Sequence, residues 1–372
     1  MSETTAPVLQ VNNLRTRFKT RSGDVHAING VSFDLQPGEL LGVVGESGSG
    51  KSVTMMSLLG LLPSPPALVS ADSVQFEGLD LLRCTPTQLR AIRGAKIGFI
   101  FQDPMTSLNP VFSVGYQIME PLRKHMHMDK AAARQRAQEL LELVGIPDAQ
   151  RRLKDYPHQF SGGMRQRVMI AIALACNPKV LIADEPTTAL DVTIQAQILE
   201  LVRELRHKLG MAIVYITHDL GVVAGIADRA MVMYGGQIVE MAPVAELFER
   251  PAHPYTRGLL KTMPRLKGPR APKLDVIQGQ PPILKAEPTA CAFRPRCTVA
   301  LERCARENPQ RQTIGTGHDV ACFWDAQTGG ERYVRSHTSH GAGAQPQGAL
   351  SHLLGLAAAA QRRSAGGGRR KL

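Results

Sequence analysis

The sequence predicts an α/β fold built around a parallel sheet, with a helical insertion and a small irregular part near the C-terminus. Residues 40–44 form a short apolar run that suits a buried parallel strand. Similar apolar runs lie at residues 97–101, 180–185 and 212–217, and stretches with helical spacing occur between them. Strands that alternate with helices are typical of α/β proteins.

The residues after the first apolar run match the phosphate-binding pattern G-x-x-x-x-G-K-S. They are Gly45, Glu46, Ser47, Gly48, Ser49, Gly50, Lys51 and Ser52. The glycines allow a tight turn that exposes backbone N–H groups to an anion, and the helix expected next directs its positive end there. Lys51 supplies a charge for the β- and γ-phosphates, and the Ser52 hydroxyl is a ligand for Mg²⁺. The sequence therefore predicts a site for a nucleoside triphosphate.

Two short strands are expected before this loop, at residues 8–11 and 31–35. Phe18 falls between them, and two interpretations stay open: a core residue, or an aromatic ring that stacks on adenine. After the strand at 97–101 the pattern becomes helical, and Asp129 is placed to cap a helix that ends at Gly145. We expect this stretch to be a helical insertion in the α/β core.

Further along the chain, Ser161 is placed to cap a helix whose buried side includes Val168, Ile172 and Ala175. All three positions are apolar and follow the helical repeat.

Two carboxylates, Asp184 and Glu185, end the strand at residues 180–185. Ligands of open parallel sheets bind at the carboxyl ends of the strands, so Asp184 is placed to hold Mg²⁺ and Glu185 to polarise an attacking water. The alternative is a pair of solvated acids at a helix start, which Pro186 marks. His218 follows the strand at 212–217, as a structural residue or as a hydrogen-bond partner of a γ-phosphate.

Taken in order, these motifs resemble an ABC-type P-loop NTPase, the ATP-binding cassette of ABC transporters. The resemblance rests on Phe18, the loop at 45–52, Gln102, the S-G-G at 161–163, the strand at 180–185, the A-L-D at 189–191 and His218. It covers residues 8–245. It implies a RecA-like core, an antiparallel β subdomain and a helical subdomain at about 103–178.

The resemblance also implies residue roles. Glu185, His218 and Gln102 would be catalytic, Ser52, Gln102 and Asp184 would hold Mg²⁺, and Phe18 and the loop residues would bind ATP. Two cassettes would dimerise head to tail, so that one phosphate loop faces the S-G-G of the other. The residues that contact the partner's nucleotide would be Ser161, Gly162 and Gly163, with Asp191 in the neighbouring D-loop. Phe160 and Met164 depart from the commonest signature, L-S-G-G-Q, so Met164 is not assigned to the site.

A second resemblance, to the oligopeptide/dipeptide importer branch of this family, extends to about residue 325. It rests on residues 160–167, 183–193, 253–260 and the G-Q-P-P at 279–282. It implies the ATPase motor of a peptide importer at the cytoplasmic face of the inner membrane. The implied partners are two permeases, a second, paralogous cassette and, indirectly, an extracytoplasmic peptide-binding protein. Cargo such as nickel, glutathione, antimicrobial peptides or sugars stays open, as does a soluble ATPase acting on DNA or ribosomes.

Four of the six cysteines lie close together in the sequence, with the spacing C-x5-C-x6-C-x17-C. They are Cys291, Cys297, Cys304 and Cys322. Disulfides are rare in cytosolic chains, and the C-x2–4-C pairs of structural zinc sites are missing. The importer resemblance implies a [4Fe-4S] cluster here, with four unliganded thiols or adventitious zinc as alternatives. Four arginines lie nearby and would offset the charge of the cluster: Arg294, Arg296, Arg303 and Arg306.

The net charge of +12 lies entirely in the C-terminal third of the chain. Residues 251–372 contain 19 Lys or Arg and 7 Asp or Glu, so residues 1–250 are neutral and a nucleic-acid partner is not expected. No apolar run reaches the length of a membrane span, and no signal peptide is expected. We divide the chain into an ATPase domain at 1–250, an extension at 251–325 and a disordered basic tail at 326–372.

Overall fold

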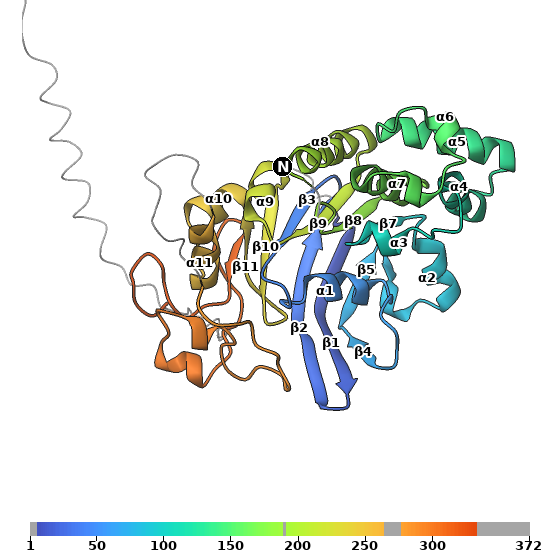
Figure 1. The fold of residues 1–372 in the computed structure, drawn as a ribbon. Helices are drawn as coiled ribbons and strands as arrows, with labels where there is room; N and C mark the ends of the chain where they lie inside the picture. The colour runs from blue at the N-terminus through green and yellow to red at the C-terminus, as the bar shows by residue number, and fades with distance from the viewer. Residues whose placement is uncertain (1–5, 189–190, 264–276, 333–372) are drawn as a thin grey trace, which may run out of the picture. The chain divides into compact units, whose positions relative to one another are not determined.

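The computed structural model describes residues 6–188, 191–263 and 277–332. The described residues belong to one compact unit that ends at Arg332. The predicted basic tail beyond residue 332, and two residues of the A-L-D motif, Ala189 and Leu190, lie outside the described residues. The structure mixes parallel sheet, antiparallel sheet and helices, as the sequence predicts for this fold class (Figure 1).

The main sheet has the strand order β12-β13-β11-β10-β3-β9-β8-β7. Its parallel strands are β3 (Leu40–Val44), β7 (Ile97–Ile100), β8 (Val180–Asp184), β9 (Ala212–Thr217) and β10 (Arg229–Tyr234). Antiparallel strands continue it at one edge: β11 (Gln237–Pro243), β12 (Gln312–Gly315) and β13 (His318–Val320). The last two come from the C-terminal extension, which thus shares the sheet of the ATPase.

A second, antiparallel sheet precedes the phosphate loop. It contains β1 (Leu9–Thr20), β2 (Gly23–Leu35), β4 (Ala67–Ser70), β5 (Ser73–Phe76) and β6 (Leu79–Asp80). The two short strands expected here are therefore one long hairpin, and Phe18 lies inside β1 opposite Val25. Register shifts and a stretch at residues 15–20 that is polar except for Phe18 hide the alternation that would have indicated strand.

Some of the helices cover the two faces of the main sheet, and others form the helical insertion (Figure 1). They are α1 (Lys51–Leu58), α2 (Pro86–Ile92), α3 (Pro104–Ser107), α4 (Val114–His125), α5 (Lys130–Leu143), α6 (Ala149–Arg152), α7 (Gly162–Leu174), α8 (Val192–Leu209), α9 (Leu220–Ile226), α10 (Val244–Glu249) and α11 (Pro254–Thr262). Short 3₁₀ turns are η1 (Leu81–Arg83), η2 (Pro157–Gln159), η3 (Arg294–Arg296) and η4 (Glu302–Ala305). Within the described ranges, no helix combines the length and apolar character needed to cross a membrane.

Alternate residues of the central strands enter two different hydrophobic cores. In β9, Ile213 and Tyr215 pack with the helical side, whereas Val214 and Ile216 pack with β1, β2 and α1. Both faces of these strands are buried, which explains why they read as continuous apolar runs instead of alternating ones.

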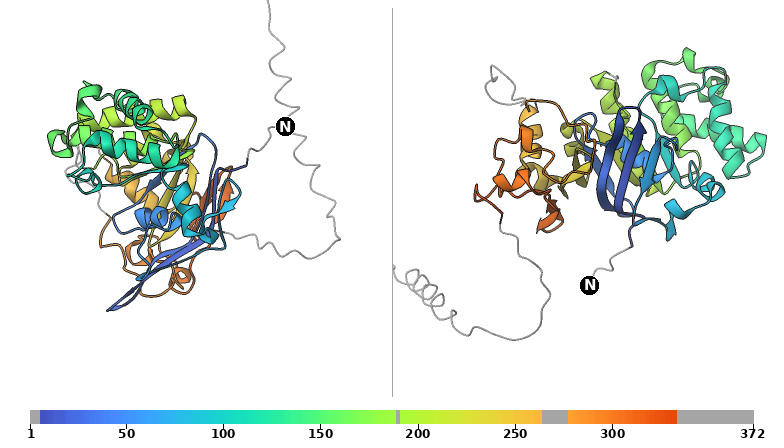
Figure 2. Two further views of the ribbon diagram at one scale, coloured as in Figure 1. Left: turned by 90° about the vertical axis from the view of Figure 1, so that its right-hand side faces the viewer. Right: turned by 90° about the horizontal axis from the view of Figure 1, so that it is seen from below.

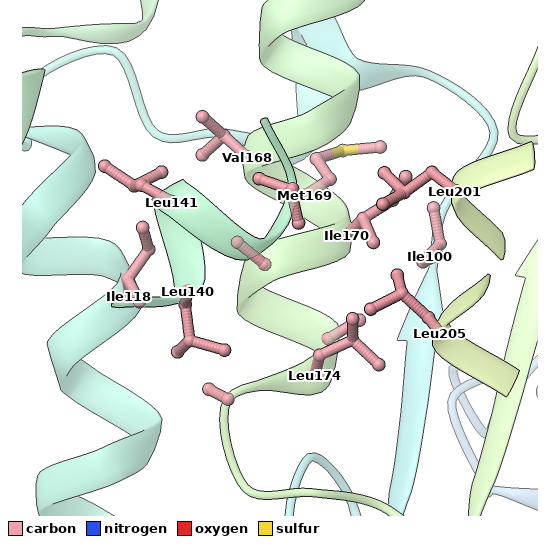
Figure 3. Close-up of a cluster of buried hydrophobic side chains, with 14 of the residues drawn as sticks. Ile100, Ile118, Leu140, Leu141, Val168, Met169, Ile170, Leu174, Leu201 and Leu205 are labelled. Carbon is pink, nitrogen blue, oxygen red and sulfur yellow. The ribbon is translucent and has the colours of Figure 1, made fainter. Parts of the chain in front are cut away.

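The helical insertion is held by the first of these cores. Figure 3 shows side chains of α4, α5, α7 and α8 meeting beside β7, among them Ile118, Leu140 and Ile170. The Asp129 side chain caps α5 by accepting the N–H groups of Ala131 and Ala132, as the sequence predicts. The blue β1–β2 hairpin lies between these green helices and the orange extension (Figure 2).

The helix after the S-G-G sequence also begins as expected. The Ser161 side chain accepts the N–H of Met164 at 3.3 Å and caps α7. Val168 and Ala175 are buried, whereas Ile172 is only partly buried at the edge of the core.

The extension is attached to the ATPase body through a buried carboxylate, that of Glu240 on β11. Its two oxygens accept the N–H groups of Ala252 at 2.6 Å and His253 at 2.8 Å, and Nε2 of His318 lies 2.8 Å from Oε1. Burial lowers the pKa of His253 to about 4, so the ring is neutral and its Nδ1 accepts the N–H of Tyr255 at the start of α11. One carboxylate thus joins β11, α11 and β13.

We predict that Glu240→Ala lowers the free energy of unfolding by about 3 kcal/mol, because it leaves three buried donors without their acceptor. The measurement is denaturant unfolding of the full chain. The matched control is Glu249→Gln on the exposed side of α10, which should change the value by less than about 0.5 kcal/mol. Equal stabilities of the two variants would contradict this role.

Candidate functional site

The phosphate loop joins β3 to α1 through two glycines that other residues could not replace. Gly45 has φ 152°, and a Cβ there would lie 2.3 Å from the carbonyl oxygen of Met233. Gly50 has φ 103° and directly precedes α1, where a Cβ would lie 2.8 Å from Ile28 Cδ1. The loop therefore wraps closely against its neighbours and presents the N-terminus of α1.

Lys51 begins α1 and crosses the loop. Its side chain is 5% exposed, and Nζ donates to the carbonyl oxygens of Gly45 at 2.8 Å and Glu46 at 3.1 Å. Oε1 of Glu185 lies 4.0 Å from the same nitrogen. Burial lowers the pKa of Lys51, and the carboxylates of Glu185 and Asp184 oppose that shift. The loop thus holds a desolvated ammonium where phosphate oxygens are expected to bind.

The predicted Mg²⁺ ligands Ser52 and Asp184 are in direct contact. Ser52 Oγ donates to Asp184 Oδ1 at 2.8 Å, although 132 residues separate them in the sequence. Asp184 is buried at the end of β8, and burial raises the pKa of its carboxyl group. A hydroxyl and a carboxylate are the hard oxygen donors that Mg²⁺ prefers, and a divalent cation would favour the ionised carboxylate.

Glu185 is the point where the predicted catalytic residues meet. Its Oε2 accepts a hydrogen bond from Gln102 Nε2 at 3.2 Å and lies 3.3 Å from His218 Nδ1. Its backbone has φ 46°, a conformation that costs a non-glycine residue about 1–2 kcal/mol and is concentrated at functional sites. Thr188 Oγ1 also donates to Oε2, at 2.9 Å. Sequence reasoning missed Thr188, although it stands three residues after the glutamate.

The S-G-G residues remain apart from this cluster. Within the described residues, Ser161, Gly162 and Gly163 make no hydrogen bond to the phosphate loop of their own chain. Ser161 and Gly162 are exposed at the start of α7. Asp191 caps α8 by accepting the N–H of Ile194 at 3.0 Å.

Other residues of the predicted ATP site differ in exposure. Ser47 and Gly48 are exposed at the tip of the loop, and Phe18 is half-buried on β1. Ser49 is buried, and its Oγ has no hydrogen-bond partner within the described part of the chain.

Glu46 differs from its neighbours in the loop, because the C-terminal extension engages it. Arg296 binds its carboxylate, and the Tyr255 hydroxyl accepts its backbone N–H. Sequence reasoning missed both residues, which lie more than 200 positions away and belong to no motif that indicates a phosphate loop contact.

The four clustered cysteines line one small cavity, together with His253, Phe293 and Trp324. Burial raises the pKa of Cys291 to about 11 and that of Cys322 to about 12, so these thiols are protonated at neutral pH. Across residues 6–188, 191–263 and 277–332, no group of three or more His, Cys, Asp or Glu side chains is arranged to hold a metal ion. The predicted [4Fe-4S] cluster is not supported by this arrangement.

The arginines around the cysteines also differ from the prediction. Arg296, Arg303 and Arg306 form ion pairs with Glu46, Glu307 and Glu302, respectively. Arg294 lines the cavity. Most of the positive charge expected to balance a cluster is therefore already balanced by carboxylates.

Comparisons with known proteins agree with this geometry. The family model described as "ABC transporter" matches residues 28–188, and the model "Oligopeptide/dipeptide transporter, C-terminal region" matches residues 239–304. The oligopeptide transport ATP-binding protein OppD of Bacillus subtilis is 53% identical over 84% of this chain and 87% of its own length. The dipeptide transport ATP-binding protein DppD of the same organism is 52% identical over 86% and 95%. The chain belongs to this family of ABC transporter ATP-binding proteins.

Solved structures show the same cassette. A dimeric ATP-binding cassette in a post-hydrolysis state with ADP and Pi has a TM-score of 0.57 and 28% identity, over 63% of this chain and 98% of that one. The cassette cbiO1 of Clostridium perfringens has a TM-score of 0.55 and 30% identity, over 66% and 92%. The protein is an ATPase that uses ATP and Mg²⁺, and the P-loop NTPase fold predicted from the sequence is confirmed.

We predict that Glu185→Gln retains ATP binding but lowers the hydrolysis rate about 10²- to 10⁴-fold, because the amide cannot accept a proton from water. Steady-state phosphate release and equilibrium ATP binding by the full chain are the two measurements. Glu204→Gln on the exposed face of α8 is the control and should hydrolyse ATP at the wild-type rate. Near-normal turnover of Glu185→Gln would contradict its role as the base.

Proposed function

We propose that this ATPase is the motor subunit of an importer for dipeptides or oligopeptides at the cytoplasmic face of the membrane. The main support is the pairing of an ABC cassette with the C-terminal region named for oligopeptide and dipeptide transporters, at residues 239–304. The curated relatives named above are peptide transport proteins that this chain matches at 52–53% identity. Nickel, glutathione and antimicrobial peptides are the alternative cargoes.

The site geometry suggests how the motor works. Asp184 and Ser52 would hold Mg²⁺, Lys51 would bind the β- and γ-phosphates, and Glu185 would take a proton from the attacking water. Ser161 and Gly162 are exposed, and the S-G-G residues are separate from the phosphate loop of their own chain, which fits a role toward the nucleotide of a second, paralogous cassette. ATP would then close the cassette pair, and hydrolysis would let it reopen.

The helical insertion offers a surface for the permeases. Exposed large apolar residues lie around its first helices: Phe101, Val111, Phe112 and Tyr116. The rings of Phe112 and Tyr116 stack at 4.7 Å, and soluble proteins rarely expose such a group without a partner. Phe101 directly precedes Gln102, which donates to Glu185. A cytoplasmic loop of a permease that binds Phe101 would therefore contact the residue next to Gln102 in the sequence.

We also propose that the four clustered cysteines hold a [4Fe-4S] cluster after local rearrangement. The support for this proposal is that the four cysteines, although spread from residue 291 to residue 322, line the same cavity. Four thiolates are the usual ligand set of such a cluster, and metal binding would have to displace the protons that burial retains on the thiols of Cys291 and Cys322, whose pKa values it raises.

Anaerobically purified protein should contain about four irons per chain, and Cys304→Ser should lose most of them. Elemental analysis gives the count, and an absorption spectrum distinguishes a cluster from loosely bound iron. Cys176→Ser, which changes a cysteine outside the cavity, should keep the metal. Protein that contains zinc or no metal would refute the cluster and leave the cassette assignment intact.

Uptake of labelled di- to pentapeptides tests the proposed cargo. Cells that lack this gene should lose uptake of one peptide length class, and wild type should restore it. Lys51→Ala should not restore it, because the loop loses its ammonium, whereas Lys208→Ala on the surface of α8 should. Unchanged uptake of every peptide would refute peptide import and direct the same assay to the alternative cargoes.

A further inference from the structure

The carboxylate of Glu46 is held by a residue 250 positions further along the chain. Nη1 of Arg296 donates to Oε2 at 2.5 Å, and Nη2 donates to Oε1 at 2.9 Å. The Arg296 side chain is 4% exposed and that of Glu46 is 28% exposed, so the guanidinium is buried while the carboxylate keeps some contact with solvent. A bidentate guanidinium–carboxylate pair fixes orientation as well as distance, and it is among the stronger hydrogen-bonded contacts in proteins.

Arg296 is itself held in place by the extension. Its Nε donates to the carbonyl oxygen of Gln278 at 2.9 Å, and its Nη2 to that of Ile277 at 3.1 Å. Its guanidinium carbon lies 5.7 Å from the ring centroid of Tyr234. The residue ends the short turn η3, directly before Cys297. The position of the fork is therefore determined by how the extension folds and packs against Tyr234 at the end of β10.

A second contact holds the main chain of the same loop residue. The N–H of Glu46 donates to the hydroxyl of Tyr255 at 2.8 Å. Tyr255 is fully buried on α11, and its ring lies 4.7 Å from Tyr234 and 5.3 Å from Phe293, between centroids. The carbonyl oxygen of Glu46 meanwhile accepts from Lys51 Nζ. The extension and Lys51 thus hold opposite sides of one peptide segment.

We propose that Arg296 and Tyr255 of the extension are positioning residues of the ATP site. By holding Glu46, they keep the glycine-rich loop in the conformation that receives the β- and γ-phosphates and keep Lys51 in place. A loop with three glycines has much conformational freedom, and ordering it in advance lowers the cost of binding nucleotide. This role concerns ATP affinity and is independent of the cargo.

The test is the dissociation constant of Mg-ATP for the full chain. Arg296→Gln and Glu46→Gln should each raise it by about 3- to 30-fold. The double variant should bind no more weakly than the weaker single variant, because both substitutions break one interaction. The control is Arg294→Gln on the same turn, whose exposed side chain has no ion pair in the described residues and whose substitution should leave affinity unchanged.

Steady-state kinetics distinguish positioning from a general loss of structure. Partial unfolding would lower kcat by reducing the active fraction and leave KM for ATP unchanged. Positioning predicts the reverse: KM rises with the dissociation constant, and kcat at saturating ATP changes by less than about twofold. Arg296→Lys, which keeps the charge without the fork, should give an intermediate KM.

Two outcomes would overturn the proposal. One is unchanged ATP affinity in Arg296→Gln, and the other is a double variant whose loss equals the product of the two single losses. If Arg296→Gln does not fold, Tyr255→Phe and Arg296→Lys replace it, since each keeps most of the packing. Unchanged affinity in both of these would overturn the proposal equally.

Discussion

The buried ammonium of Lys51 is the constraint around which the site is arranged. A charge removed from water is stable only where hydrogen-bond acceptors or opposite charges surround it. Two loop carbonyls provide the acceptors, and they face Nζ because Gly45 turns the chain in a conformation that disfavours a side chain. Glu185 provides the opposite charge from the end of β8. The position of the lysine thus depends on a turn and on a strand far away in the sequence.

Local signals in the sequence were sufficient for much of this arrangement. The buried strands β8 and β9 are apolar on both faces, so composition alone indicated them, and the caps Asp129 and Ser161 act within three residues of themselves. Since parallel strands end at the same edge, Gln102, Glu185 and His218 could be expected to meet there. The full length of the β1–β2 hairpin could not be predicted. Its outer half is mostly polar and shows no regular alternation of apolar and polar residues, so only the pairing of the two strands reveals it.

Contacts that lack a local signal were not predictable. Arg296 and Glu46 are separated by 250 residues, and His318 and Glu240 by 78, so no spacing rule connects them. Both contacts depend on the tertiary fold, in which β12 and β13 extend the main sheet and the extension lies against the phosphate loop. The cysteines show the converse: proximity in sequence correctly indicated that they gather, but their spacing did not determine whether the thiols face one another as metal ligands.

The ATP site is therefore connected to the helical insertion and to the extension through a few side chains. Gln102, directly before the helical insertion, reaches the carboxylate of Glu185, the residue predicted to act on water. From the extension, Arg296 reaches the carboxylate of Glu46, whose carbonyl holds Lys51. The first contact is made at 3.2 Å by an exposed amide, whereas the second is a two-bond pair made by a buried guanidinium. Because an exposed single hydrogen bond contributes less to stability than a two-bond, charge-assisted pair, the insertion side is suited to exchange partners during a cycle, and the extension side is suited to hold the loop constant.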